Sequence, residues 1–277
     1  MGSEIQSGAD PEAVLERLYG CDGGEGREGG EGEGREGCDG RVDWKGADGI
    51  LQVTAIAASD RATIALGPAA PLSPMDRFLL GFARARVEAL VTTGAILRAE
   101  PELRHDYAEE PGQDAAWAAW RSKTLGLEAP PALILLSRSG NFPERHPAIE
   151  AASAGLLWTS RETRARLGPK LGALDVVVAE EFGAGVAAAI GYAQERLGLR
   201  RISVEAGPSA SKSLYEETAG AKLSEVLLSL FSGELADEAR AATFPAEARL
   251  SSLGLRKMSR VDVEQPSGLW TFERYRR

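Results

Sequence analysis

The chain has 277 residues, a formal net charge of −9 and a hydrophobic share of 43%, which suits a packed globular protein with one large domain or two small ones. The acidic balance and the scattered Lys and Arg residues argue against nucleic acid binding, which needs a basic face. No apolar run is long enough to cross a bilayer, and residues 1–18 carry acids where a signal peptide would be basic and then apolar, so we expect a cytoplasmic protein.

The first expected element is a short helix over residues 10–19, with Asp10 as its cap and Pro11 at its first position. The Gly/Glu/Arg-rich tract that follows, residues 20–40, cannot bury apolar surface, so we expect it to be disordered. It carries the two cysteines of the chain, Cys21 and Cys38. Free thiols are favoured over a disulfide or a metal site, because metal sites need more ligands at tighter spacing. Residues 1–40 therefore form one expected part and residues 41–277 form one domain.

Within this domain, expected strands alternate with expected helices. A Ser73-Pro74 helix start precedes one of them, and Gly198 is a suitable helix stop. The alternation predicts an α/β sheet covered on both faces, and the hairpin-like end predicts an antiparallel edge. The expected strands are 49–59, 88–94, 131–137, 155–160, 175–180, 201–205, 222–233, 255–265 and 269–277, and the expected helices are 73–87, 112–126, 183–198 and 209–220.

Small and polar residues recur where three of these strands end. Glu205 stands at the tip of one strand, and Gly207, Pro208 and the serines 209, 211 and 213 follow it. This stretch suits a helix start that binds phosphate, and an ordinary turn with an N-cap is the alternative. Residues 91–100 end a second strand with Arg98 and Glu100, and Ser137 with Arg138 ends a third. The carboxyl ends of parallel strands meet along one edge of a sheet, where ligands bind.

The order of these stretches resembles the pyrimidine reductase family of riboflavin biosynthesis, whose dihydrofolate-reductase-like domain forms the C-terminal half of the bifunctional deaminase-reductase. The resemblance runs from about Leu51 to Arg277, and the zinc-binding His/Cys pattern of the deaminase is absent. It implies a three-layer αβα fold with a mixed, mostly parallel central sheet and an antiparallel C-terminal edge. The matching stretches are "SPMDRFLLGFARARVEAL", "LRAEPEL", "ALILLSRSG", "LLWTS" and "RRISVEAGPS".

The resemblance also implies a function: the NADPH-dependent reduction of a ribosylaminopyrimidine phosphate at the ribose C1, by a homodimer. By position, Arg84 would bind the substrate phosphate, Glu205 would hold the substrate hydroxyls, and Arg138 with Ser137 would meet the 2′-phosphate of NADPH. Ala58 would border the nicotinamide, and residues 207–213 would wrap the pyrophosphate. The implied substrate residues are Arg84, Leu103, Arg104 and Glu205, and the implied cofactor residues are Ala58, Thr93, Gly94, Ile96, Glu100, Ser137, Arg138, Thr159, Gly207, Pro208, Ser209, Ser211 and Ser213.

The chain has two histidines, His105 and His146, and neither falls in a matching stretch, so we expect both at the surface. No catalytic residue is therefore assigned, and water or a substrate group would supply the proton. The alternatives for the two charged substrate residues are ordinary ones. Arg84 would be a solvated helix residue, and Glu205 would cap a neighbouring turn.

Three departures from the family pattern fall at the same crevice. The family's Ser-Leu-Asp-Gly becomes Asp60, Arg61 and Ala62 over its last three places, its Gly-x-x-Thr becomes residues 93–96 with Ile96 last, and its Gly-Gly becomes Ala206 and Gly207. Two hypotheses follow. The retained residues favour an active NADPH reductase, and the alternative is a non-catalytic dimeric relative with a closed or altered pocket. The strand 224–231 would supply a dimer edge or belong to the core.

Overall fold

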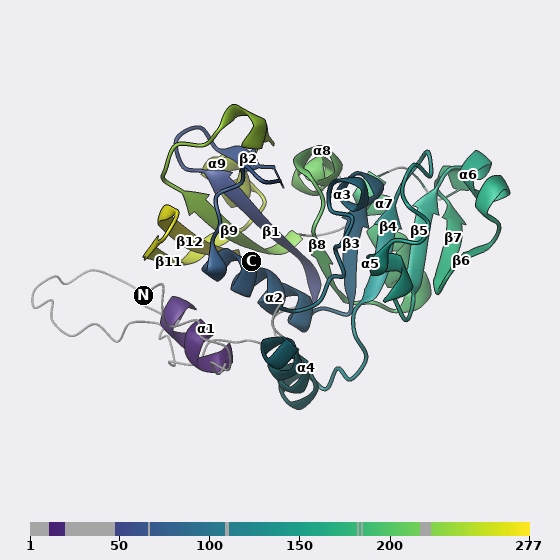
Figure 1. Cartoon of the computed structure of the whole chain (residues 1–277), viewed down its shortest axis with the longest axis horizontal. Helices are drawn as coiled ribbons and strands as arrows, with labels where there is room; N and C mark the ends of the chain where they lie inside the picture. The colour runs from purple at the N-terminus through teal and green to yellow at the C-terminus, as the bar shows by residue number, and fades with distance from the viewer. Residues whose placement is uncertain are drawn as a thin grey trace, which may run out of the picture.

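The computed structural model describes residues 11–19, 48–65, 67–108, 111–181, 183, 185–216 and 223–277. Within these ranges the main sheet has the strand order β11-β12-β9-β1-β8-β3-β4-β5-β7-β6 (Figure 1). Neighbours from β9 to β7 are parallel, while β9-β12-β11 at one end and β7-β6 at the other are antiparallel. The sheet is thus mixed and mostly parallel, with an antiparallel C-terminal edge, as the sequence predicted.

The long elements lie where the sequence predicted them, whereas the short ones α3, α5, α6, α9, β2, β6 and β10 were not expected. The strands are β1 (Gly49–Ala57), β2 (Ala62–Ile64), β3 (Ala89–Thr93), β4 (Ala132–Leu136), β5 (Gly155–Thr159), β6 (Lys170–Leu171), β7 (Leu174–Val178), β8 (Arg201–Val204), β9 (Leu223–Phe231), β10 (Arg240–Thr243), β11 (Arg256–Gln265) and β12 (Gly268–Arg276). The helices are α1 (Pro11–Tyr19), α2 (Pro74–Arg86), α3 (Gly94–Ala99), α4 (Pro111–Leu125), α5 (Pro147–Glu150), α6 (Arg161–Leu167), α7 (Gly185–Leu197), α8 (Pro208–Ser211) and α9 (Glu247–Ser252).

The helix boundaries follow from local chemistry. At the start of α2, the Ser73 hydroxyl accepts a hydrogen bond from the Asp76 N–H (2.9 Å), and Pro74 takes the first helical position, where no N–H is needed. α7 ends before Gly198, which has a φ of 70° that favours glycine. Residues 209–220 differ from the expected helix, because α8 is a single turn that continues as a 3-10 helix over Lys212–Tyr215.

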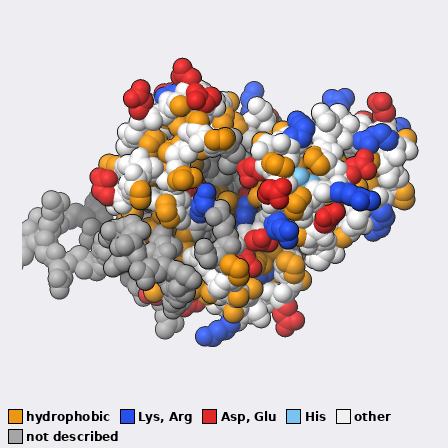
Figure 2. All heavy atoms as spheres, in the orientation of Figure 1, with side chains coloured by type: hydrophobic (Ala, Val, Ile, Leu, Met, Phe, Trp, Pro, Cys, Tyr) orange, Lys and Arg blue, Asp and Glu red, His pale blue; other side chains and the backbone are white. Residues whose placement is uncertain are grey.

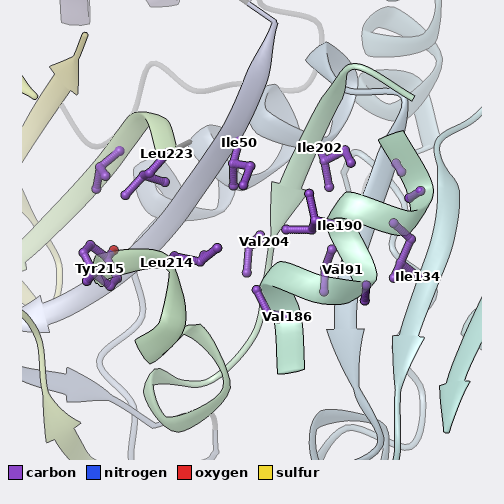
Figure 3. Close-up of a cluster of buried hydrophobic side chains, with 14 of the residues drawn as sticks. Ile50, Val91, Ile134, Val186, Ile190, Ile202, Val204, Leu214, Tyr215 and Leu223 are labelled. Atoms are coloured by element: carbon purple, nitrogen blue, oxygen red, sulfur yellow. The ribbon is translucent and has the colours of Figure 1, made fainter. Parts of the chain in front are cut away.

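Helices cover both faces of the sheet. On one face α7 packs Val186 and Ile190 over Val91, Ile134 and Ile202 of neighbouring strands (Figure 3). On the other face α1, α2 and α4 pack against β1, β3, β9, β11 and β12, and α3 with α5 cover β4, β5 and β7. The side chains of successive strand residues point to opposite faces of the sheet, as the pleat of a strand requires. None of the helices in the described ranges is both long and apolar enough to cross a membrane.

Helix α1 shares the core of the large domain. Val14, Leu15 and Leu18 are buried in the same cluster as α2 and α4, and the Glu12 carboxylate accepts a hydrogen bond from the Trp120 indole (2.9 Å). The structure thus joins this helix to the domain, although we grouped it with the glycine-rich tract. Asp10, both cysteines, the tract and the boundary at residue 40 lie outside the described residues.

A buried ion network lies beneath α1, where β9 meets β12. The Glu225 carboxylate accepts hydrogen bonds from Arg86 (3.0 and 2.8 Å) and from the Arg274 Nε (2.8 Å). Burial opposes ionisation of this carboxyl, but the two guanidinium groups outweigh it and lower the pKa of Glu225 to about 2. β9 lies between β12 and β1, so the expectation that residues 224–231 supply a free edge is wrong, and their alternative placement in the core is confirmed.

Candidate functional site

The carboxyl ends of five neighbouring parallel strands carry most of the residues singled out in the sequence. In sheet order these strands are β1, β8, β3, β4 and β5. Ala58 follows β1, residues 205–213 follow β8, residues 94–100 follow β3, and Ser137 with Arg138 follows β4. The sheet order confirms that these strand ends meet along one edge. In Figure 1 the ends of β8 and β3 lie below α8 and α3, and Figure 2 shows acidic and basic side chains beside one another over the same region.

At the centre of this edge, Arg84 and Glu205 form an ion pair. Arg84 Nε donates to both oxygens of the Glu205 carboxylate (2.9 and 3.1 Å), and its Nη2 donates to Oε2 (2.7 Å). Both side chains are 10% exposed. A third donor, Nη1, bonds the Asp106 carbonyl (2.7 Å). Burial acts against the charge of Arg84, but the Glu205 carboxylate outweighs this and raises the pKa of Arg84.

This pairing differs from the expectation that Arg84 binds a substrate phosphate. Three of the five N–H groups of a guanidinium are used here by the protein, and the buried position leaves little surface for an anion. Among the described residues, Glu205 Oε1 accepts one hydrogen bond, from Nε, which leaves a lone pair for another donor. In this arrangement Arg84 orients Glu205, and Glu205 is the group that can face a ligand.

The two histidines lie close to this pair, and the surface expectation is wrong for His146. His146 is 1% exposed and caps α5, where its Nδ1 accepts from the Ala148 N–H (3.2 Å). Since Nδ1 accepts, the ring proton is on Nε2, which donates to the Glu100 carbonyl (2.9 Å). His146 therefore fixes the end of α3 to the start of α5. The sequence did contain a signal for this cap, because Pro147 in "HPAIE" marks a helix start.

His105 is half-buried and has a φ of 58°, an uncommon backbone conformation for a residue other than glycine. Its Nε2 is buried and has no hydrogen-bond partner among the described residues. Burial is the main cause that lowers the pKa of His105 to about 4. The Glu205 carboxylate acts to raise this pKa and the Arg84 guanidinium acts to lower it, and both effects are smaller than that of burial. The imidazole is therefore neutral at pH 7.

The other residues of this loop have different surroundings. Glu100 caps the end of α3, its Oε1 is buried without a partner in the described ranges, and burial raises its pKa against the opposing effect of Arg84. Leu103 packs on the apolar cluster of α3 and α5, and Arg104 is exposed. The structure thus brings Arg84, Glu205 and Glu100 together, whereas Leu103 serves packing.

The loops after β3 and β4 are held tightly together. The Thr93 hydroxyl caps α3 by accepting from the Ile96 N–H (3.3 Å), while Thr159 is fully buried and donates to the Ser137 carbonyl (2.6 Å). At Gly94 an added Cβ would lie 2.7 Å from the Ser137 hydroxyl oxygen. Thr93 and Thr159 thus hold the loops that carry the other predicted site residues.

We expect Gly94→Ala to destabilise the protein by about 1–3 kcal/mol, because the methyl group has no room against Ser137. Gly207→Ala is the matched control: Gly207 begins α8 with a φ of −58°, and nothing lies within 4 Å of an added Cβ. Its free energy of unfolding should stay within about 0.5 kcal/mol of wild type. Urea denaturation measures both values, and equal stabilities would contradict the packing argument.

The loop after β4 borders a cavity of about 820 Å³. Arg138 and Ser139 line it together with Ser160 and Arg161 at the start of α6, and the remaining lining residues are Glu162, Ala165 and Glu180. Guanidinium and hydroxyl groups at one wall complement a phosphate. Arg138 thus lines this cavity, and its contact with a phosphate stays a prediction from the sequence.

The polar groups of the segment after β8, residues 205–213, differ in their exposure and in their hydrogen bonding. Ser211 is buried and its hydroxyl donates to the Ala206 carbonyl (2.9 Å), whereas the Ser213 hydroxyl oxygen is buried with no partner among the residues described. Gly207 and Ser209 are exposed, and Pro208 takes the first position of α8. Of the predicted pyrophosphate donors, Ser211 is therefore engaged by the protein.

Arg61, the bulky cation that departs from the family pattern, is held by contacts within the protein. Arg61 has a φ of 61°, its Nη2 donates to the Pro245 carbonyl (2.6 Å), and its guanidinium carbon lies 5.6 Å from the centre of the Phe244 ring. The side chain is thus fixed on the loop between β10 and α9. Ala58, at the end of the same strand, is exposed.

The chain has the fold of the pyrimidine reductases of riboflavin biosynthesis, a dihydrofolate-reductase-like fold, as comparison with solved structures shows. A pyrimidine reductase-like protein from Corynebacterium diphtheriae matches with a TM-score of 0.60 and 18% identity, over 83% of this chain and 91% of that chain. The Saccharomyces cerevisiae riboflavin biosynthesis reductase Rib7 matches with a TM-score of 0.54 and 10% identity, over 83% and 90%.

A structure of RibD from Acinetobacter baumannii matches with a TM-score of 0.55 and 16% identity, over 83% of this chain and 58% of that chain. The chain thus corresponds to somewhat more than half of the RibD protein. No protein-family model and no curated protein matches the sequence. At these identities the likeness is one of fold, and the sequence resemblance is confirmed at that level.

Proposed function

We propose that the protein is an NADPH-dependent reductase of a ribosylaminopyrimidine phosphate, which reduces C1 of the ribose. The observation that carries the proposal is the Glu205 carboxylate, held by Arg84 at the carboxyl edge of a reductase-type sheet. A carboxylate with a free lone pair, fixed in a largely dry site, accepts a hydrogen bond from a sugar hydroxyl. Arg84 acts on the substrate through Glu205, by holding that carboxylate in a fixed orientation.

The surroundings of the site fit the cofactor. The cavity beside Arg138 and Ser139 offers a cation and a hydroxyl for a 2′-phosphate, and the space next to Gly207 is open for a pyrophosphate. The buried Ser213 hydroxyl has no partner among the described residues, and we propose that it is a further donor to that phosphate. When bound, NADPH supplies the hydride for the reduction. The protein's part is to hold the nicotinamide and the sugar in contact, which accounts for much of the barrier reduction in such reactions.

The proposal predicts that NADPH binds more tightly than NADH. Arg138→Ala should weaken NADPH binding by about 10- to 100-fold, because a charge-assisted hydrogen bond to phosphate is lost, and should leave NADH binding nearly unchanged. Titration of the purified protein, followed by nicotinamide fluorescence, measures both affinities. Arg256→Ala is the control, since Arg256 is an exposed arginine on the edge strand β11.

Two outcomes of this titration decide between hypotheses. Equal losses of NADPH and NADH affinity in Arg138→Ala would remove the 2′-phosphate role from that residue. If neither nucleotide binds wild type at millimolar concentrations, the reductase proposal fails and the non-catalytic relative becomes the better account. The homodimer and the cytoplasmic location stay predictions from the sequence.

A further inference from the structure

We infer that His105 contacts the sugar of the substrate and determines specificity for its hydroxyl groups, together with Glu205. This inference rests on the proposed function, because it assigns a role within the same site. Three independent observations carry it: the way the loop of residues 100–106 is held, the unpartnered polar atoms on that loop, and the charge state of the imidazole.

The loop that carries His105 is fixed at both ends. At its start, the Glu100 carbonyl accepts hydrogen bonds from His146 Nε2 (2.9 Å) and from the Leu103 N–H (3.1 Å). At its end, the Asp106 carbonyl accepts from Arg84 Nη1 (2.7 Å), so the residue next to His105 is bonded to the guanidinium that holds Glu205. The position of His105 relative to Glu205 is therefore set by the protein before any ligand binds, which is a property of binding sites.

The same loop carries two buried polar atoms without partners in the part of the chain that the structure describes, namely His105 Nε2 and Glu100 Oε1. Buried polar atoms are hydrogen-bonded in the great majority of cases, so an unpartnered one points to a ligand or a water. The φ of 58° at His105 is a second unusual feature, and strained backbone of this kind gathers at functional sites. Both features coincide on one residue beside the Arg84–Glu205 pair.

The chemistry of the two groups selects a hydroxylated ligand. The imidazole is neutral, so Nε2 is either a donor or an acceptor according to its tautomer. A hydroxyl group satisfies both tautomers, because it can donate and accept. The neighbouring Glu205 carboxylate accepts only, and a second hydroxyl satisfies it. A sugar with adjacent hydroxyls provides both groups, whereas a deoxysugar leaves one buried atom unpaired, which is costly.

The test uses the fact that the chain has two histidines. In protein labelled with ¹⁵N-histidine, each imidazole gives its own signals, and His105→Asn assigns them. We expect the Nε2 signal of His105 to move when ribose 5-phosphate is added, to move less with 2-deoxyribose 5-phosphate, and the His146 signals to stay. A stationary His105 signal while the sugar phosphate binds, or no binding of ribose 5-phosphate at all, would overturn the inference.

Kinetics provide the second arm, with 5-amino-6-(5-phosphoribosylamino)uracil and NADPH as substrates. His105→Asn tolerates the left-handed backbone but is too short to reach the sugar, so KM for the pyrimidine should rise about tenfold with no change in NADPH affinity. His105→Gln should recover part of the loss, and Glu102→Gln, at an exposed position on the same loop, should match wild type. If the wild-type protein neither turns over the substrate nor binds NADPH, the result contradicts the proposed function. An active wild type with an unchanged KM in His105→Asn contradicts the inference alone.

Discussion

Replacing Arg84 by methionine is expected to lower the free energy of unfolding by about 3–5 kcal/mol, because it leaves the Glu205 carboxylate buried without its partner. Reductase activity should fall by about 100-fold or more, since Glu205 loses the group that orients it. Denaturant titration measures the first effect, and the rate of NADPH oxidation with the pyrimidine substrate measures the second. Glu102→Gln is the control, because Glu102 is an exposed carboxylate on the same loop.

The double variant Arg84→Met/Glu205→Gln separates the two effects. It removes both charges of the pair, so its stability should recover relative to the sum of the single variants, as expected for residues in direct contact. Its activity should stay low, because the sugar-binding carboxylate is gone. Additive stability losses would mean that the pair is not coupled. Full activity in Glu205→Gln would exclude Glu205 from the site.

The second large effect concerns Glu225, whose carboxylate is buried between Arg86 and Arg274. Its pKa is lowered to about 2 in the folded protein, whereas an unfolded glutamate titrates near 4.3. The folded state binds the proton less readily, so ionised Glu225 contributes stability that is present above pH ~4.3 and is lost as the pH falls toward 2. By linkage this contribution is about 3 kcal/mol at neutral pH.

Glu225→Gln should therefore be less stable than wild type by about 3–5 kcal/mol at pH 7, since two buried guanidinium groups lose their counter-charge. The difference should shrink steadily between pH ~4.3 and pH ~2. Thermal unfolding over this pH range measures it. The exposed pair of Arg166 and Glu144, joined at 2.7 Å, provides the control: Glu144→Gln should cost at most about 1 kcal/mol. A constant difference across the acid range would contradict the lowered pKa.

The sequence predicted those elements whose boundaries depend on local patterns. The buried run of β1, the Ser73-Pro74 start of α2 and the Gly198 end of α7 each follow from side chains within one turn or strand. The short helix α3 was missed because the strand pattern before it runs on to Gly94, and the close packing of Gly94 on Ser137 comes from tertiary structure.

For the site, the sequence predicted that particular strand ends share an edge, because parallel topology dictates this. It did not predict that Arg84 bonds Glu205, 121 residues away, since that contact depends on how α2 lies across the sheet. His105 has no recognisable signal in the sequence: neither a helix cap nor a strand end marks it. Its positive φ, and a nitrogen without a partner in the described part of the chain, can be recognised only in the three-dimensional structure.

The position of β1 in the middle of the sheet constrains the order of events during synthesis. Apart from a short antiparallel contact with β2, β1 pairs with β8 and β9, which lie far along the chain. Residues 201–231 have to be synthesised before β1 can pair with β8 and β9. The apolar side chains of β1 therefore stay exposed to solvent while the intervening segment is made. We therefore expect the yield of folded protein in heterologous expression to rise when chaperones that bind exposed hydrophobic segments are co-expressed.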